Sequence, residues 1–358
     1  MGLPIGFLIF LTFLTSVYAG INFYVLWRTS RFFHIPRNIW FYVAWIILTL
    51  SAAGVVVLCR GPRGLIASVV HYICGVWMGF AFILFFLYLP WEILKFLIKV
   101  PPRKAGLVII SIAVILTIYS LLNALNFRVR KNAFSSSKIK TPARIVHISD
   151  AHLGPINRKG YLEKVVKKIN SLEPDAVFIT GDFVDCDYPY IEDDFSPLSE
   201  IESRVYFSMG NHERYSDMSK IAPLIEVTGT RFLRNEKISE EKWDITAIDD
   251  ADDYDQVSKI IKDIPLDPER FNIVMYHRPA GMEAARKAGG DLFLCGHVHG
   301  GQIVPFNFIT GWFFYRPVRG FHNHNGMGLN VSTGTGYWGP PLRLGSFNEI
   351  VVIDLLPG

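Results

Sequence analysis

Acidic residues are almost absent from the first 140 positions of the chain. Glu92 stands alone there against 14 Lys and Arg, whereas the remaining 218 residues hold 31 acids and 22 bases. Charged residues make up 19% of the sequence, below the roughly one quarter that is typical of soluble domains. The net charge of +4 is therefore an average over two unlike halves. This composition excludes an ordinary soluble globule for the first half.

Cysteine is also scarce, and long basic runs are missing. The four cysteines lack the paired spacing of a zinc ribbon and are too few for a disulfide-rich mini-protein. The chain has no extended Lys/Arg run and no repeat that alternates aromatic and basic residues. We therefore expect no nucleic-acid polymer as a partner. Protein partners are unknown from the sequence.

Long apolar stretches fill the first half. A helix needs about 20 apolar residues to cross a bilayer, and its backbone polar groups must be bonded internally. Residues 3–27, 39–58, 65–98 and 105–125 each reach this length. They predict a transmembrane bundle of four helices over residues 1–131, which makes the chain an integral membrane protein of the cell or inner membrane with the lipid bilayer as its partner.

The charges in the loops bear on which side of the membrane the second half faces. The loops after the first and third stretches carry seven Lys and Arg, and the opposite side also carries seven. If the first helix sets the orientation, its uncharged amino terminus lies outside. The second half is then extracytoplasmic.

A polar segment separates the two halves. Residues 132–141 contain three consecutive serines and two lysines, which is typical of a flexible linker. This segment predicts a domain boundary, with a second domain over residues 142–358.

Short apolar runs alternate with helical stretches in the second half, and this pattern predicts an α/β domain. The expected strands are 144–149, 176–180, 205–209, 271–276 and 291–295, with a helix at 161–172. Active sites in α/β sheets form at the carboxyl ends of strands. Polar clusters directly after these strands are therefore the candidate site.

Five such clusters occur in order. They are Asp150-Ala151-His152, Gly181-Asp182, Gly210-Asn211-His212-Glu213, His277 and Gly296-His297-Val298-His299. Carboxylate oxygen mixed with imidazole nitrogen suits Mn, Fe, Zn or Co. The number of ligands exceeds one tetrahedral site, so two ions are expected. Any single histidine could instead be a core or loop residue, but five clusters in order at strand ends favour a metal site.

The ordered clusters resemble the calcineurin-like metallophosphoesterase superfamily from Arg144 to nearly the end of the chain. Residues 329–350 and the pair Asp249-Asp250 are similar to its bacterial membrane-associated branch, although Ala247 and Ala251 replace a glycine and a proline of that branch. The resemblance implies a four-layer αββα sandwich. It also implies two divalent metal ions, with Mn expected first and Fe, Zn or Co as alternatives.

The resemblance further implies roles for individual residues. His212 is expected beside the phosphate, as an acid for the leaving oxygen, with Asp185 orienting it. A hydroxide that bridges the ions would attack phosphorus in line. The metal ligands divide into two sets: Asp150, His152 and His299 bind one ion, Asn211, His277 and His297 bind the other, and Asp182 bridges both.

An aromatic and basic segment follows the last cluster, at residues 305–321. Aromatic rings beside arginines suit the headgroup level of a membrane. Phe308, Trp312, Phe313 and Arg316 are therefore expected to face lipid. The alternative is a packed loop in which residues 312–314 belong to the core.

These features together predict a membrane-anchored, metal-dependent phosphoric ester hydrolase of the phosphodiesterase or pyrophosphatase type. Its substrate is expected to be a lipid or a lipid-linked phosphate. One alternative is a tethered phosphatase of soluble nucleotides or phosphoproteins. Another is a transporter or sensor with a regulatory metal domain, although the scarcity of charge within the apolar stretches disfavours transport of a charged solute.

Overall fold

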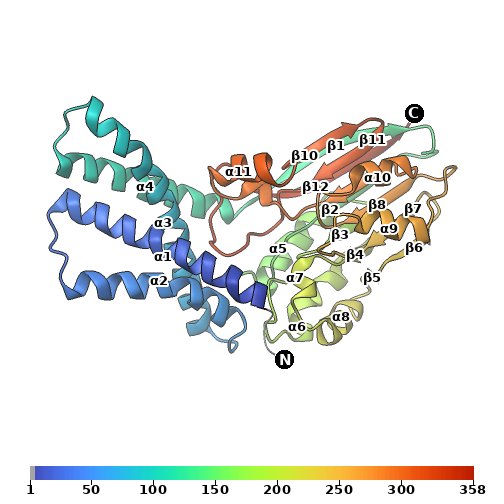
Figure 1. Ribbon diagram of the computed structural model, residues 1–358. Helices are drawn as coiled ribbons and strands as arrows, with labels where there is room; N and C mark the ends of the chain where they lie inside the picture. The colour runs from blue at the N-terminus through green and yellow to red at the C-terminus, as the bar shows by residue number, and fades with distance from the viewer. Residues whose placement is uncertain (1–4) are drawn as a thin grey trace. The chain divides into compact units, whose positions relative to one another are not determined.

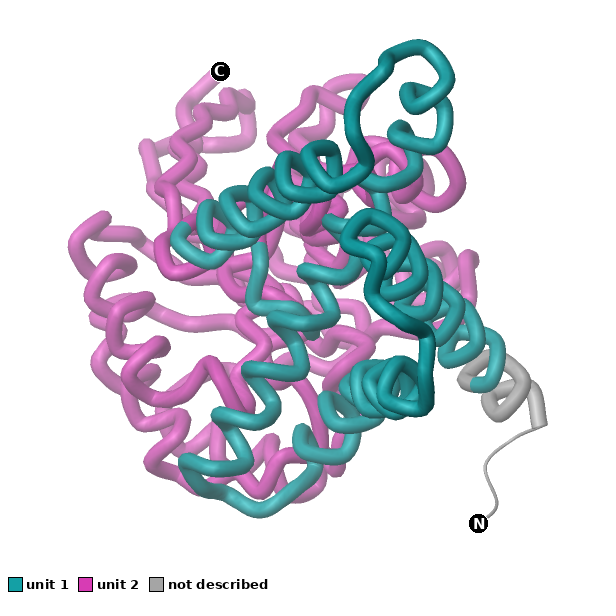
Figure 2. Tube along the Cα trace, turned by 90° about the vertical axis from the view of Figure 1, so that its left-hand side faces the viewer, with its two compact units in different colours: residues 1–122, 339–342 teal, residues 123–338, 343–358 magenta. Residues whose placement is uncertain are grey.

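The chain forms two compact units. The computed structural model describes the backbone from Ile5 and the side chains from Thr12 to Gly358. One unit comprises Met1–Leu122 with Gly339–Leu342, and the other comprises Asn123–Trp338 with Arg343–Gly358 (Figure 2). We call them the helical unit and the catalytic unit.

The helical unit contains long helices with apolar surfaces. They are α1 (Ile5–Phe33), α2 (Ile39–Cys59), α3 (Leu65–Leu97) and α4 (Pro102–Ala124), whose last two residues lie in the catalytic unit (Figure 1). Within the described residues, three of them, α2, α3 and α4, are long and apolar enough to cross a membrane. The prediction of four spans is therefore corrected to three candidate spans in the described part of the chain. The side of the membrane that the catalytic unit faces stays a prediction.

The described part of helix α1 carries buried polar groups and makes hydrogen bonds to neighbouring helices. The expected first span begins in residues outside the described part, and the rest of α1 includes Asn22 and Arg28, both buried. Asn22 accepts a hydrogen bond of 2.9 Å from the indole N–H of Trp77 on α3, and the indole N–H of Trp45 on α2 donates to the main-chain oxygen of Ala19 at 2.8 Å. Hydrogen bonds between helices thus hold α1 against its neighbours, in addition to apolar packing.

Small residues let the backbones of the helical unit approach closely. A Cβ atom added at Gly106 of α4 would lie 2.6 Å from the Cβ of Phe32 on α1. At Gly79 of α3 it would lie 2.0 Å from a methyl carbon of Leu342, which belongs to the returning segment Gly339–Leu342. Glycines at such positions permit the close contacts on which helix association in membranes depends.

The catalytic unit contains two mixed six-stranded sheets. The first has the order β1-β12-β2-β3-β4-β5, and the second has the order β10-β11-β9-β8-β7-β6. Strands β2, β3, β4 and β5 run parallel, as do β7, β8, β9 and β11. The strands of the first sheet are β1 (Phe127–Ser136), β12 (Asn348–Pro357), β2 (Ala143–Ile148), β3 (Ala176–Thr180), β4 (Arg204–Ser208) and β5 (Arg231–Leu233). Those of the second are β10 (Gly320–His324), β11 (Met327–Val331), β9 (Leu292–Cys295), β8 (Asn272–Tyr276), β7 (Asp244–Ile248) and β6 (Glu236–Ser239).

Alternating side chains on these strands build separate cores. On β3, Phe178 packs in the core between the sheets, whereas Val177 and Ile179 pack outward with α5 (Lys159–Asn170) and α8 (Met218–Glu226). On β9, Leu292 and Leu294 face the central core. Phe293 and Cys295 pack outward, in the core that includes α9 (Gln256–Asp263) and α10 (Met282–Lys287) (Figure 1). The order of layers is helix, sheet, sheet, helix, and the predicted α/β domain is confirmed.

The five expected strands correspond to β2, β3, β4, β8 and β9, each within one residue at its ends, and the expected helix corresponds to α5. The expected linker at 132–141 is corrected. Its first half lies in β1, which pairs in parallel with β12 from Phe127 to Ser136. Only residues 125 and 126 separate α4 from this strand.

We predict that Gly106→Ala destabilises the helical unit. The new methyl group would overlap the root of the Phe32 side chain, which cannot rotate away, and such overpacking costs about 1–3 kcal/mol. The thermal unfolding midpoint of the detergent-solubilised full chain should fall. Gly20→Ala is the control, because nothing lies within 4 Å of its added Cβ. Equal midpoints for the two variants would contradict the close contact.

Candidate metal centre

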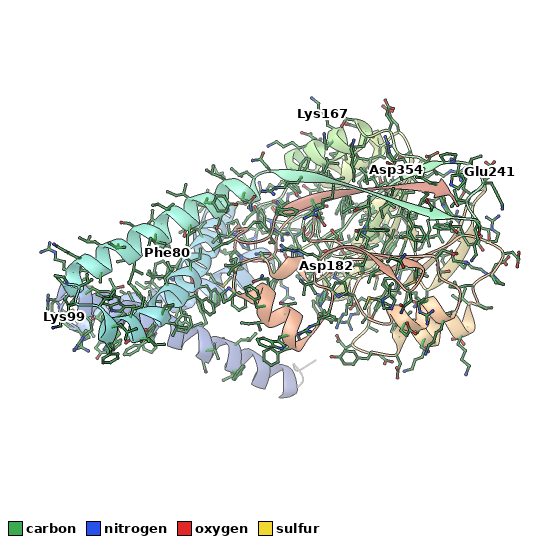
Figure 3. The ribbon with its side chains drawn as sticks, turned by 90° about the horizontal axis from the view of Figure 1, so that it is seen from above. Phe80, Lys99, Lys167, Asp182, Glu241 and Asp354 are labelled. Carbon is green, nitrogen blue, oxygen red and sulfur yellow. The ribbon has the colours of Figure 1, made fainter. Side chains whose placement is uncertain are left out.

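The expected ligands meet at the carboxyl ends of parallel strands from both sheets. Asp150 follows β2, Asp182 follows β3 and is labelled in Figure 3, and Asn211 follows β4. From the second sheet, His277 follows β8 and His297 follows β9. A hydrogen bond joins the two sheets here, as the His277 Nδ1 lies 2.8 Å from the main-chain oxygen of Thr180 on β3. The site therefore lies where the two sheet edges meet.

Asp150, His152 and His299 form the first group, and all three are buried. Their ligand atoms lie within 4.8 Å of one another. The Nε2 atoms of His152 and His299 are 3.1 Å apart, and the His299 Nε2 lies 3.3 Å from an Asp150 oxygen. Two ligand atoms that are each about 2.1 Å from one ion lie roughly 3 Å apart. The spacing suits a single divalent ion.

Asp182, His277 and His297 form the second group with the same spacing. The Asp182 Oδ2 lies 3.0 Å from the His277 Nε2, which in turn lies 3.2 Å from the His297 Nδ1. The same Asp182 oxygen is 4.0 Å from the His152 Nε2 of the first group. The bridging role of Asp182 stays a prediction, and its carboxylate lies between the two groups as that role requires.

Asn211 fits the second group through an unpaired oxygen. Its Oδ1 is buried and has no hydrogen-bond partner among the described residues. Buried polar atoms are nearly always satisfied, so an orphan acceptor beside carboxylate and imidazole ligands is a candidate metal ligand. The residues present thus fit a divalent ion in each group.

The protonation states of three buried ligands, Asp182, His297 and His299, suit metal binding. Burial opposes ionisation of Asp182, yet His277, His212 and His152 hold its pKa well below the usual range. Burial lowers the pKa of His297 to about 3, and it lowers the pKa of His299 strongly. An ionised carboxylate and neutral imidazoles are the forms that bind a metal. Burial also works against a charged His277, but Asp182 raises the pKa of His277 to about 10.

The backbone at the site is strained. Five of the seven expected ligands have positive φ angles, although none is glycine: Asp150, His152, Asp182, His297 and His299. Non-glycine residues seldom adopt this region, and such strain gathers at functional sites. Glycine is required beside them, because a Cβ at Gly296 would lie 2.2 Å from the Asp150 Oδ2 and one at Gly210 would lie 2.3 Å from the Asp182 Oδ1.

His212 lies next to the first group. Its ring is 4.7 Å from the His152 ring, and its Nδ1 contacts the main-chain oxygen of Asp185. The Asp185 carboxylate lies 3.6 Å from the same Nδ1, but it is closer, at 3.1 Å, to the Nδ1 of His152. Asp185 therefore contacts both histidines, through its main chain for His212 and through its side chain for His152.

Glu213 has a structural role that the sequence analysis did not assign. Its buried carboxylate accepts hydrogen bonds from the main-chain N–H groups of Asp182, Phe183, Val184 and Gly210, at 2.7, 2.8, 3.1 and 2.7 Å. It thereby fixes the loops after β3 and β4, which carry Asp182 and Asn211. The sequence did contain an indication of this role, because Glu213 is the last residue of the Gly210-Asn211-His212-Glu213 cluster.

Arg343 is a second residue without an assigned role. It is fully buried, and it donates to the main-chain oxygen of His299 at 2.8 Å and to that of Gly336. Its Nε donates to the Asn348 side chain at 2.8 Å. Arg343 lies within residues 329–350, the stretch that resembles the bacterial membrane-associated branch. Its position in that stretch was the feature of the sequence that could have indicated a role.

Helix α11 (Phe306–Phe313) carries the aromatic segment and buries none of its residues. Phe308 is 64% exposed, Trp312 and Phe313 are each 76% exposed, and Arg316 is exposed. The alternative in which residues 312–314 belong to the core is therefore wrong. The helix ends near the metal site, because the ring of Tyr315 lies 5.6 Å from the ring of His297.

Comparisons with known proteins indicate a family for the second half of the chain. A family model described as calcineurin-like phosphoesterase matches residues 143–301. The chain is 26% identical to a Campylobacter jejuni protein named an uncharacterized metallophosphoesterase, over 98% of each chain. It is 29% identical to a similarly named Aquifex aeolicus protein, over 68% of this chain and 97% of that protein.

One vertebrate relative is named a transmembrane protein. A Bos taurus protein named transmembrane protein with metallophosphoesterase domain is 31% identical over 59% of this chain, and the match covers 52% of that protein. The chain thus matches about half of that relative's length. The ligand groups at the strand ends agree with the family match, and residues 143–301 form a calcineurin-like phosphoesterase domain.

Proposed function

We propose that this chain is a membrane-anchored, two-metal phosphoesterase that hydrolyses a phosphodiester or pyrophosphate bond of a lipid or lipid-linked substrate. The metal groups support the hydrolysis. The observation that carries the lipid assignment is the exposed aromatic surface of α11, formed by Phe308, Trp312 and Phe313.

The first step concerns the end of α4, a candidate membrane span. The side chain of Asn123, in its last turn, donates to the main-chain oxygens of Arg343 and Ser346 at 2.9 and 2.8 Å. The side chain of Asn348 donates to the main-chain oxygen of Ala124 at 2.8 Å. The end of α4 is thus fixed to the 343–348 loop of the catalytic unit.

The second step connects the same loop to α11. Just before α11, the N–H of Val304 donates to the oxygen of Leu344 at 2.8 Å. Just after it, Arg319 donates to the oxygen of Gly345, also at 2.8 Å. Both flanks of the aromatic helix are therefore held by the loop that holds the end of α4.

The third step is chemical. Exposed Trp and Phe beside Arg316 and Arg319 suit the interface, where rings bury in the lipid and guanidinium groups meet phosphates. Tyr315 then links this surface to the metal ligand His297. A lipid held on α11 would present its phosphate to the metal groups.

The residues of the site divide the chemical work. Asp150, His152 and His299 would hold one ion, and Asn211, His277 and His297 the other, with Asp182 shared. When bound, two divalent ions supply Lewis acidity toward the phosphoryl oxygens and lower the pKa of water toward neutrality. We assign Mn as the first candidate, because the oxygen and nitrogen ligands suit borderline divalent ions.

His212 supplies the proton for the leaving group. Its Nδ1 contacts the main-chain oxygen of Asp185, so its Nε2 is the ring nitrogen left for the substrate. A protonated Nε2 gives its proton to the leaving oxygen as the bond from phosphorus to that oxygen breaks and a bond from phosphorus to the oxygen of water forms. The Asp185 carboxylate keeps His152 oriented beside it.

Asp182→Asn tests the two-metal site. The amide removes the shared negative charge, and the loss of several kcal/mol of transition-state stabilisation should lower kcat about a thousandfold or more. The fold should persist, as circular dichroism of the purified full chain would show. Asp187→Asn, an exposed position on the same loop, is the control and should keep full activity. Substantial turnover by Asp182→Asn would refute the two-metal assignment.

Glu213→Gln tests how the ligand loops are held. In the variant, one amide oxygen replaces two carboxylate oxygens, and the amide N–H groups face main-chain donors. At least one buried main-chain N–H therefore loses its acceptor, which costs about 1–3 kcal/mol. Metal content after dialysis and the unfolding midpoint should both fall. The exposed Glu226→Gln should change neither. Full metal content in Glu213→Gln would contradict the positioning role.

The paired variant Trp312→Ser/Phe313→Ser tests the lipid assignment. Full-length protein, stripped of metal and then given Mn²⁺, is assayed with a lipid-linked phosphodiester in vesicles and with a water-soluble aryl phosphodiester. Removing two rings that would insert into the lipid should lower turnover of the lipid substrate at least about tenfold, because burying an aromatic side chain contributes about 1.5–3 kcal/mol. Turnover of the soluble ester should not change.

The control for this pair is Tyr254→Ser, which removes a ring that is 85% exposed elsewhere in the catalytic unit. It should leave both activities intact. If wild type hydrolyses both esters equally and the paired variant loses neither activity, the helices are a tether and the substrate is soluble. If Mn²⁺ restores no hydrolysis of either ester, the enzymatic proposal itself fails.

A further inference from the structure

We infer that the helical unit contains a binding site for the phosphate headgroup of an anionic lipid, separate from the metal centre. The site is a cavity of about 650 Å³, within the range of small-molecule pockets. All of its lining residues belong to the helical unit. They come from the end of α1, the segment between α1 and α2, the end of α3, the segment before α4, where Figure 3 labels Lys99, and the first residue of α4.

The lining is strongly cationic. Arg28, Arg31, Arg37 and Lys95 all line the cavity, and no acidic residue does. Clustered Lys and Arg next to membrane helices attract anionic headgroups, and between helices they form basic pockets for them. Guanidinium groups are especially suited to phosphate, because two N–H groups can bind two of its oxygens.

One of these cations is preorganised. The Arg28 side chain is only 9% exposed, with its Nε 3.0 Å from Glu92 and its guanidinium 5.1 Å from the centre of the Phe32 ring. Glu92 also accepts hydrogen bonds from Tyr24 at 2.9 Å and from Lys95 at 2.6 Å. The single acid of the first 140 residues therefore holds two cavity cations in place.

Two other cations remain available for a ligand. Arg31 and Arg37 are exposed, and neither side chain makes a hydrogen bond or an ion pair with a described residue. Glu92 neutralises one of the two cations that it binds. The cavity thus keeps an excess of positive charge that a phosphate would offset.

The apolar part of the lining favours a lipid over a free phosphate. Phe32 and Trp91 are buried beside the cations, whereas Ile35 is 50% exposed and Val100 is 38% exposed. A free anion needs no apolar wall. A lipid needs both cationic and apolar walls, because its phosphate would contact the arginines while its glycerol and upper acyl carbons contact the apolar side chains. Tryptophan is typical of the interface between membrane and water, where these parts of a lipid lie.

The test uses the full-length chain in neutral detergent. Its unfolding midpoint is measured with added phosphatidylglycerol, phosphatidylcholine, glycerol 1-phosphate or inorganic phosphate. We expect phosphatidylglycerol to raise the midpoint by at least about 3 °C, because a ligand that binds only the folded state stabilises it. The other three additions should raise it by less than about 1 °C by the same linkage.

The paired variant Arg31→Gln/Arg37→Gln should lose this shift while keeping the midpoint of the lipid-free protein, since both side chains are exposed. Arg60→Gln, an exposed cation in the segment between α2 and α3, should keep it. Native mass spectrometry gives an independent measurement: the paired variant should retain one phosphatidylglycerol fewer than wild type. Trp312→Ser/Phe313→Ser should retain the shift, which separates this site from the lipid surface of α11.

Several outcomes would overturn the inference. An equal shift in wild type and in the arginine variant would show that the cavity does not bind the lipid. An equal shift with phosphatidylcholine would show that headgroup charge is not recognised. An equal shift with inorganic phosphate would make the cavity a site for a free anion. Because no metal and no turnover are involved, each outcome is independent of the phosphoesterase proposal.

Discussion

The contact between Asp182 and His277 is the interaction on which the site depends, because it joins the two sheets. Asp182 follows a strand of the first sheet, His277 follows a strand of the second, and their side chains approach to 3.0 Å. The other nitrogen of His277 reaches the oxygen of Thr180. The ligand set is divided between the sheets, so neither sheet alone makes a complete site. Packing in the central core is what brings the halves of the metal centre together.

The strain at the ligands has to be held by their surroundings. Positive φ angles at five ligands cost of order 1–3 kcal/mol each. Glu213 offsets part of this cost with four main-chain hydrogen bonds, and buried Arg343 holds the oxygen of His299. Removing either anchor would relax the loops rather than unfold the sheets. The two residues therefore matter for ligand geometry more than for the core.

The sequence predicted the strands of the site because each is a short apolar run that ends in a polar cluster. It did not predict β1, which is rich in polar and basic residues and has no buried position. The three consecutive serines at its end also suggest a flexible segment. The strand forms because it pairs with β12, more than 200 residues away, and such long-range pairing leaves no local pattern. The contacts of Asp185 were hidden for the same reason, since its carboxylate selects between two histidines that only the tertiary fold brings near it.

The structure of β1 bears on how the membrane helices relate to catalysis. A flexible linker would let the catalytic unit diffuse on a tether, and the helices would then add nothing to substrate choice. Instead, two residues separate α4 from β1, and Asn123 binds the loop that holds both flanks of α11. The end of α4 and both flanks of α11 therefore meet at one loop of the catalytic unit, and this is the observation behind the proposed membrane substrate.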